Sequence, residues 1–207
     1  TIMRRAFLLI ASLIAFVFTL GCNVSVNKNV TIEDGESSSG HTTVNGNIRV
    51  GRNAEVRGSC TTVNGSISIG DDSNIEDLQT VNGGIRIGEN VEADGDIATV
   101  NGGIETERGS RIDGKVVTIN GPIELEETTV RRDVRTHNGH ITLRSKSVVD
   151  GDIVIENNKG DSNRRRRKLK IRIDENSIVK GDIVIHEKDV DVVVYLANGG
   201  KVEGEID

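Results

Sequence analysis

Apolar residues recur along the chain in three columns, whose successive members are most often 18 or 19 residues apart. Polar residues occupy the alternate positions, which is the period-two pattern of a strand with one buried face. The pattern predicts three short strands per coil that face a shared interior. The columns are Ile48, Ile67, Ile85, Ile104, Ile123 and Ile141; Cys60, Leu78, Ile97, Val116, Val134, Ile153, Ile183 and Ile206; and Val56, Ile75, Ala93, Ile112, Val130, Val149, Val179 and Val202.

A repeated tetrapeptide marks one corner of each coil. Thr-Val-Asn-Gly begins at Thr43, Thr62, Thr80 and Thr99, and variants of it begin at Thr118 and Thr136. A fixed period this short is typical of a solenoid, in which each repeat stacks on the next. Asn and Gly tolerate a positive φ, so we expect them to turn the chain, and stacked Asn amides can bond to one another along the axis. Because connections between parallel strands are overwhelmingly right-handed, the predicted fold is an all-β, right-handed parallel β-helix of about nine coils.

The coils become irregular toward the C-terminus. The step from Gly151 to Gly181 is 30 residues, so 11 residues beyond the usual 19 are inserted, and we expect them to form a loop within 159–170. The strand that should follow the corner is delayed until Ile171. The step from Gly181 to Gly204 is 23 residues, and its four extra residues are expected near 195–198. The prediction is a single β-helix domain over 22–207 with one basic insertion.

The N-terminal stretch has the layout of a secretory signal, with a basic start, an uncharged apolar run and then Gly21-Cys22. The run is too short for a comfortable transmembrane span. Its end resembles the lipobox of bacterial lipoproteins, although Thr19 stands where Leu is usual. The resemblance implies a signal peptide over 1–21, lipidation of Cys22 as a membrane anchor and, in a Gram-negative cell, delivery to the outer membrane, because Asn23 rather than Asp follows. A plain signal peptide with an incidental cysteine is the alternative.

Composition changes the picture of the core. Hydrophobic residues make up 35% of the chain but aromatic residues only 2%, so small aliphatic side chains must fill the interior. Cys60 falls in an inward column, where a lone thiol is protected in an oxidising compartment. If Cys22 is acylated, no second cysteine is left for an intramolecular disulfide.

Basic residues concentrate in the insertion of an otherwise acidic chain. The formal net charge is −6, yet the segment 164–172 holds seven basic residues and no acidic one. Such a cluster is typical of a polyanion contact, and in an envelope protein we expect lipid phosphate, acidic polysaccharide or an acidic protein as partner. Nucleic acid is not expected, because no aromatic residues are interleaved. A loop whose charges only keep it solvated is the alternative. The candidate residues are Arg164, Arg165, Arg166, Arg167, Lys168, Lys170 and Arg172.

Carboxylates form a second candidate column beside a glycine corner. Its members are Asp77, Asp96, Asp133, Asp152 and Asp182. Stacking places neighbours about 5 Å apart, and paired carboxylates at such spacing could serve glycoside hydrolysis or hold a cation. Lys115 interrupts the column and no aromatic platform for a sugar ring accompanies it. A solvated outer corner is therefore the competing interpretation.

The remaining chemistry is sparse. The histidines, His41, His137, His140 and His186, show no metal-ligand spacing. No nucleophile elbow, phosphate loop or Cys-His constellation appears. The sequence therefore predicts a protein without enzymatic activity, cofactor or metal.

Two families share these motifs. The Thr-Val-Asn-Gly-x-Ile coils from Ser25 to Leu143 resemble the bacterial envelope family of auto-transporter-adhesin-like β-helices. The Gly-Asp-Ile coils at Gly151 and Gly181 are similar to bactofilins, which are β-helices that polymerise end to end. The resemblance implies a non-enzymatic, lipid-anchored envelope scaffold or adhesion module. Two alternatives stay open: a polysaccharide-active enzyme that uses Asp133, Asp152 and Asp182, and a self-assembling scaffold that stacks through its C-terminal coil.

Overall fold

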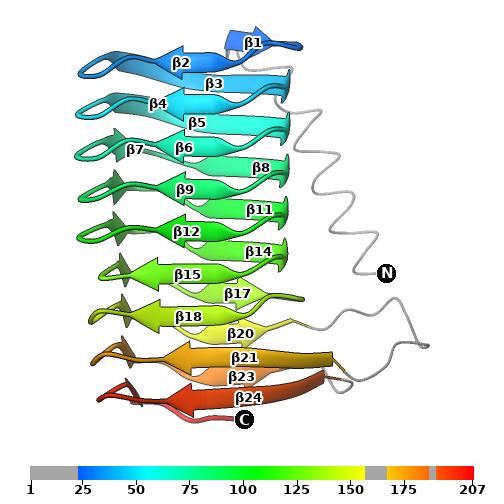
Figure 1. The fold of residues 1–207 in the computed structure, drawn as a ribbon, viewed down its shortest axis with the longest axis vertical. Helices are drawn as coiled ribbons and strands as arrows, with labels where there is room; N and C mark the ends of the chain where they lie inside the picture. Colours follow the sequence, from blue (N-terminus) through cyan, green and yellow to red (C-terminus); the bar gives the residue numbers. More distant parts are fainter. Residues whose placement is uncertain (1–22, 157–166, 187–189) are drawn as a thin grey trace.

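The chain folds into a parallel β-solenoid. The computed structural model describes residues 23–156, 167–186 and 190–207. Within these ranges the structure is all-β without a helix, and its strands stack in nine coils (Figure 1). Each coil crosses the front of the molecule toward the left, returns behind toward the right and steps down, which is a right-handed winding. The predicted β-helix is confirmed.

Three stacks of strands form the walls. The front sheet contains β2 (Val30–Ile32), β4 (Ile48–Val50), β6 (Ile67–Ile69), β9 (Ile85–Ile87), β12 (Ile104–Thr106), β15 (Ile123–Glu126), β18 (Ile141–Arg144), β21 (Arg167–Ile173) and β24 (Val190–Leu196). The short-strand stack contains β7 (Asn74–Ile75), β10 (Glu92–Ala93), β13 (Arg111–Ile112), β16 (Thr129–Val130), β19 (Val148–Val149), β22 (Ile178–Val179) and β25 (Lys201–Val202). The long-strand stack contains β8 (Leu78–Asn82), β11 (Ile97–Asn101), β14 (Val116–Asn120), β17 (Val134–Thr136), β20 (Ile153–Ile155) and β23 (Ile183–Ile185).

The first coils join two of these walls. β3 (Ser37–Asn45) and β5 (Glu55–Asn64) each run through both the short-strand and the long-strand positions, and β1 (Asn23–Ser25) pairs with β3. Because β5 pairs with both β7 and β8, the two stacks belong to one 16-stranded sheet. Three strands per coil, as predicted, thus enclose a single interior.

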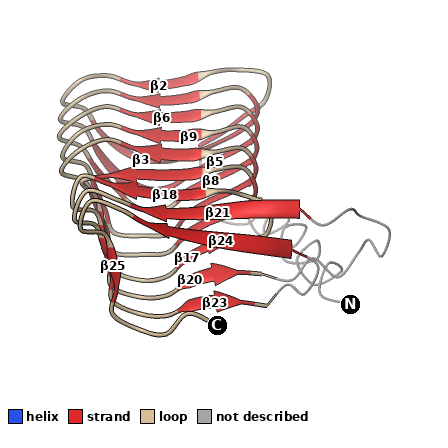
Figure 2. Ribbon diagram, turned by 60° about the horizontal axis from the view of Figure 1, so that its bottom comes forward, coloured by secondary structure: helices blue, strands red, loops and turns tan. Residues whose placement is uncertain are grey.

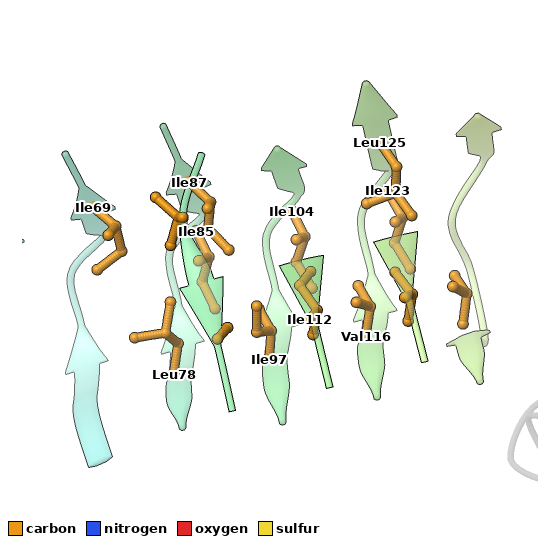
Figure 3. Close-up of a cluster of buried hydrophobic side chains, with 14 of the residues drawn as sticks. Ile69, Leu78, Ile85, Ile87, Ile97, Ile104, Ile112, Val116, Ile123 and Leu125 are labelled. Carbon is orange, nitrogen blue, oxygen red and sulfur yellow. The ribbon is translucent and has the colours of Figure 1, made fainter. Parts of the chain in front are cut away.

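Residues of one column lie directly over one another. Ile67 pairs with Ile85 and Ile85 with Ile104 along the front sheet, and Leu78 pairs with Ile97 on the long-strand stack. Figure 3 shows Ile85, Ile104, Leu78 and Ile97 pointing into the interior from successive strands. All five residues are at most 2% exposed. Each such side chain contributes about 1.5 to 3 kcal/mol, so stacked aliphatic columns take the place of an aromatic core.

Cys60 belongs to this core, as predicted, and is fully buried. Burial raises the pKa of its thiol to about 11, against a smaller lowering by the backbone N–H of His41. Since the thiolate is the reactive form, the side chain behaves as a small apolar group.

The Asn of the tetrapeptide forms a ladder along one corner. Each Nδ2 donates to Oδ1 of the Asn one coil earlier, at distances between 2.6 and 2.9 Å. The expectation that stacked amides bond along the axis is confirmed. The ladder comprises Asn27, Asn45, Asn64, Asn82, Asn101, Asn120 and Asn138.

The Thr and the Gly of the tetrapeptide both lie against the carbonyl oxygen of the tetrapeptide Gly in the preceding coil. Thr99 Oγ1 donates to the carbonyl oxygen of Gly83 at 2.8 Å, and Thr62, Thr80 and Thr118 repeat this bond on their own coils. A Cβ added to Gly102 would lie 2.0 Å from that Gly83 oxygen. Glycine is therefore required because two backbones approach closely.

The expectation that the Asn-Gly corner turns through a positive φ is wrong. Among the Asn residues of the ladder only Asn27 has one. Most positive φ values lie at the corner that follows the front sheet, where Asn53, Asp72 and Asn90 have φ of 54°, 56° and 54°. Most left-handed residues are thus at that corner, and the tetrapeptide Gly serves close approach instead.

The insertion is not a loop throughout. β21 begins at Arg167 and pairs with β24 over seven residues, from Arg167 with Val190 to Ile173 with Leu196. Arg167, Lys168 and Lys170 are therefore strand residues, and for them the predicted loop is wrong. The rest of the insertion, 157–166, lies outside the described residues.

The four extra residues of the last coil were also predicted in the wrong place. Val194 pairs with Ile171 and Tyr195 with Arg172, so the additional residues precede Val194 rather than follow it. They pair with the residues that lengthen β21. Both irregular coils thus lengthen the same wall, and pairing satisfies backbone groups that a loop would leave to water.

Two adjacent glycines test the close-approach argument. Gly102→Ala should lower the free energy of unfolding by about 2 to 4 kcal/mol, because its Cβ would meet a backbone oxygen that cannot move away. Gly103→Ala should cost less than about 1 kcal/mol, since its Cβ would lie 3.2 Å from Pro122. Chemical denaturation of both variants measures the difference. Equal destabilisation would contradict the argument.

Candidate anion-binding ribbon and the carboxylate column

The strand pair β21 and β24 carries the basic residues of the insertion. Figure 2 shows both strands reaching past the stacked coils. We call the projecting parts, residues 167–170 and 190–193, the ribbon. Lys168 and Lys170 are exposed on its outer face, while Leu169 between them is 6% exposed. This alternation places two lysines on one surface, two residues apart.

The two lysines keep their charges available. Neither ammonium group forms an ion pair with any residue that the structure describes. Asp191 lies opposite Lys168 on the neighbouring strand, and Val193 lies opposite Lys170. The backbone N–H of Lys170 donates to His140 Nδ1 at 3.1 Å, which holds the ribbon to the coil before it.

Arg172 differs from the lysines. Its Nε donates to Asp174 Oδ2 at 2.9 Å, and Nη2 bonds to the same oxygen. Hydrogen bonds from Arg172 and then from Asn198 hold the pKa of Asp174 below its usual value. The charge of Arg172 is therefore balanced within the chain, although the sequence groups it with the other candidates.

The other predicted residues lie elsewhere. Arg164, Arg165 and Arg166, like Cys22, are outside the described residues, and the side chain of Arg167 is as well. Lys168, Lys170 and Arg172 are thus the candidates whose surroundings the structure describes, and of these the two lysines carry unpaired charges.

The carboxylate column is a ladder of backbone contacts. Oδ1 of Asp152 accepts the N–H of Asp182 at 2.9 Å, and Oδ1 of Asp133 accepts the N–H of Asp152 at 3.2 Å. Asp77, Asp96 and Asp182 bond to the following coil in the same way. A Cβ on Gly181 would lie 2.3 Å from Asp152 Oδ1. The Gly of each Gly-Asp pair therefore makes room for the Asp of the coil before.

Asp133 shows why this column is unsuited to acid catalysis. Its Oδ2 accepts a hydrogen bond from Arg135 Nη2 at 2.8 Å, and Lys115 Nζ lies 3.5 Å away. Burial raises the pKa of Asp133, but the hydrogen bonds from Arg135 and the Asp152 backbone, with the charges of Arg135 and Lys115, outweigh it and leave the pKa below its usual value. A glycosidase acid needs a raised pKa. The geometry favours a structural role.

The described surface carries open grooves. One groove of about 340 Å³ crosses the front sheet over Gly84, Gly103 and Pro122. Its charged neighbours Arg86 and Glu105 are already paired at 3.0 Å. No group of three or more His, Cys, Asp or Glu residues in the described ranges is placed to hold a metal ion.

Comparisons with family models, curated proteins and solved structures find no match for the chain. The resemblances drawn from its motifs therefore stay predictions. In the part of the chain that the structure describes, no helix has the length and apolar character to cross a bilayer.

Substitutions at Asp152 distinguish the contribution of its hydrogen bond to stability from that of its negative charge. Asp152→Ala should lower the free energy of unfolding by about 1 to 2 kcal/mol, because the N–H of Asp182 loses its acceptor. Asp152→Asn keeps the Oδ1 acceptor and should remain within about 0.5 kcal/mol of the unchanged chain. Urea denaturation measures both. An Asn variant as unstable as the Ala variant would mean that charge, not the ladder, matters.

Proposed function

We propose that the chain is a non-enzymatic scaffold or adhesion rod of the cell envelope, anchored by lipid on Cys22, that presents the ribbon to an anionic partner. The observation that carries the proposal is the pair of exposed lysines, Lys168 and Lys170, on a rigid strand at the end of the rod opposite the anchor. An acidic polysaccharide is the favoured partner class.

The position of the anchor supports this arrangement. β1 begins at Asn23 and pairs with β3 in the first coil, so a lipid on Cys22 would hold the N-terminal coil at the membrane. The ribbon lies seven coil steps away, roughly 35 Å at the spacing of parallel strands. An upright rod keeps the lysines beyond the lipid phosphates of the anchoring leaflet, which favours a polymer over that leaflet as partner.

The strand setting of the lysines supports binding over mere solvation. Two lysines on one face of a paired strand have backbones at a fixed spacing, so less backbone freedom is lost on contact than in a loop. The ribbon itself is held by pairing between β21 and β24 and by the bond from Lys170 to His140, and the ladders join the coils that carry it. The same regularity suits a spacer, and it leaves the Asp column engaged with backbone rather than with a substrate.

The anchor is tested by metabolic labelling with a radioactive fatty acid. The unchanged chain should incorporate label and fractionate with the outer membrane, while Cys22→Ala should lose both label and membrane association. Ser25→Ala, three residues away, serves as the matched control and should behave as the unchanged chain. Label retained in Cys22→Ala would refute the anchor.

The ribbon is tested by binding to immobilised polygalacturonate. Lys168→Gln with Lys170→Gln should weaken binding roughly tenfold or more, since each cation near an anionic surface contributes about 1 kcal/mol. Added salt should weaken the remaining binding less steeply than it weakens binding by the unchanged chain. The control changes two cations of the first coils, Lys28→Gln with Arg49→Gln.

The control distinguishes a site from net charge. If the two double variants lose affinity equally, or if neither does, the ribbon is not the contact. Vesicles of anionic lipid, assayed in parallel, decide the source of the anion: stronger retention on vesicles than on polygalacturonate would replace the polysaccharide by lipid phosphate.

A further inference from the structure

β24 is the last strand of the front sheet in the described part of the chain. It pairs with β21 on one side, and the strand order of the front sheet ends with it, so its other side has no strand partner among the described residues. Edge strands are usually short or interrupted by Lys, Pro or a bulge. The seven residues of β24, Val-Asp-Val-Val-Val-Tyr-Leu, contain no Lys or Pro and are mostly residues that favour strands.

Exposed apolar side chains accompany this edge. Val193, Tyr195 and Leu196 are 39%, 47% and 50% exposed. Leu196 pairs with buried Ile173, so it belongs to the row of alternate β24 residues that faces the interior, which we call the inward row. Val193 and Tyr195 occupy the positions between and face outward. Unpaired backbone groups and apolar side chains therefore coincide on one strand.

We propose that β24 pairs antiparallel with β24 of a second copy of this chain, in a register centred on Val193. This is the one antiparallel alignment that pairs all seven residues. Its inward row is entirely apolar, and its outward row places Val193 opposite itself. Cross-strand pairs of this kind stabilise a sheet. The facing pairs are Val190 with Leu196, Asp191 with Tyr195, Val192 with Val194, and Val193 with Val193.

Charge is compatible with the same register. The one carboxylate of the strand, Asp191, faces the hydroxyl-bearing Tyr195 instead of another carboxylate. Lys168 lies beside Asp191 on the neighbouring strand, so a cation is close to it. The contact is isologous, and because each copy has a single β24 edge, assembly closes at two copies.

The length that the ribbon adds to β24 favours pairing with a second β24 over pairing with a shorter strand. Residues 190–193 reach past the coils (Figure 2), so in this register they lie along residues 193–196 of the second copy. The two rods are therefore offset from each other. Head-to-tail stacking would set the seven residues of β24 against the three of β2 and leave four unpaired. The inference rests on the fold. Because the two rods run in opposite directions, their N-terminal coils lie at opposite ends of the dimer, so copies anchored as proposed would meet from facing surfaces.

The test uses the full chain in density-matched detergent and measures its mass by sedimentation equilibrium. The unchanged chain should be a dimer. Val193→Lys and Val193→Glu should each raise the dimer dissociation constant at least about tenfold, because like charges would face each other at the centre of the pair. Mixing the two variants should restore the dimer, since opposite charges then meet. Val26→Lys, at an exposed position near the other end, should leave the dimer unchanged.

The mixing arm also shows that both variants are folded, because restored dimers need two intact edges. A chain that stays monomeric at about 100 µM, where a micromolar contact is almost fully formed, would overturn the proposal. Assemblies larger than two would overturn it in favour of stacking along the rod. Variants with the mass of the unchanged chain, or a mixture that stays monomeric, would place any contact elsewhere.

Discussion

Hydrogen bonding between successive parallel strands holds the coils about 4.8 Å apart, and every other feature of this molecule must fit that spacing. Backbones this close leave no room for a Cβ at Gly102 or Gly181, where the carbonyl or carboxylate of the coil before already lies. The same proximity lets Thr, Asn and Asp side chains reach one coil and no further. The composition, rich in Gly, Asn and small aliphatic residues, follows from this one distance.

The fold was open to prediction from the sequence because one constraint repeats. A buried column such as Ile67, Ile85 and Ile104 repeats once per coil, and its members also fit the two-residue alternation of a strand. The pairing register between successive coils could therefore be assigned from spacing alone. The Asn ladder followed for the same reason. Spacing does not encode backbone conformation. The sequence therefore predicts a positive φ at the tetrapeptide, whereas the structure has positive φ values at Asn53 and Asn90.

The candidate site was less predictable. Residue counts locate an insertion but not its pairing, because Arg167–Ile173 becomes a strand only by virtue of the later residues that lie beside it. The alternation of Lys168, Leu169 and Lys170 was a local signal for this strand. The ion pair between Arg172 and Asp174, which directly follows β21, was also visible as an i, i+2 pair in the sequence, yet a count of basic residues passes over it. The carboxylate column was located correctly, whereas its backbone contacts depend on a neighbouring coil.

The ladders have a direction. In the Asn, Thr and Gly-Asp series it is the later coil that donates and the earlier coil that accepts: Asn101 to Asn82, Thr99 to Gly83, Asp96 to Asp77. In these three series each coil offers oxygen acceptors to the next coil, whose N–H and O–H groups donate to them. The buried backbone N–H groups of Ala54 and Val91 run the other way and donate to the Ser73 and Ser110 hydroxyls of the coil after them, so neighbouring coils depend on each other in both directions.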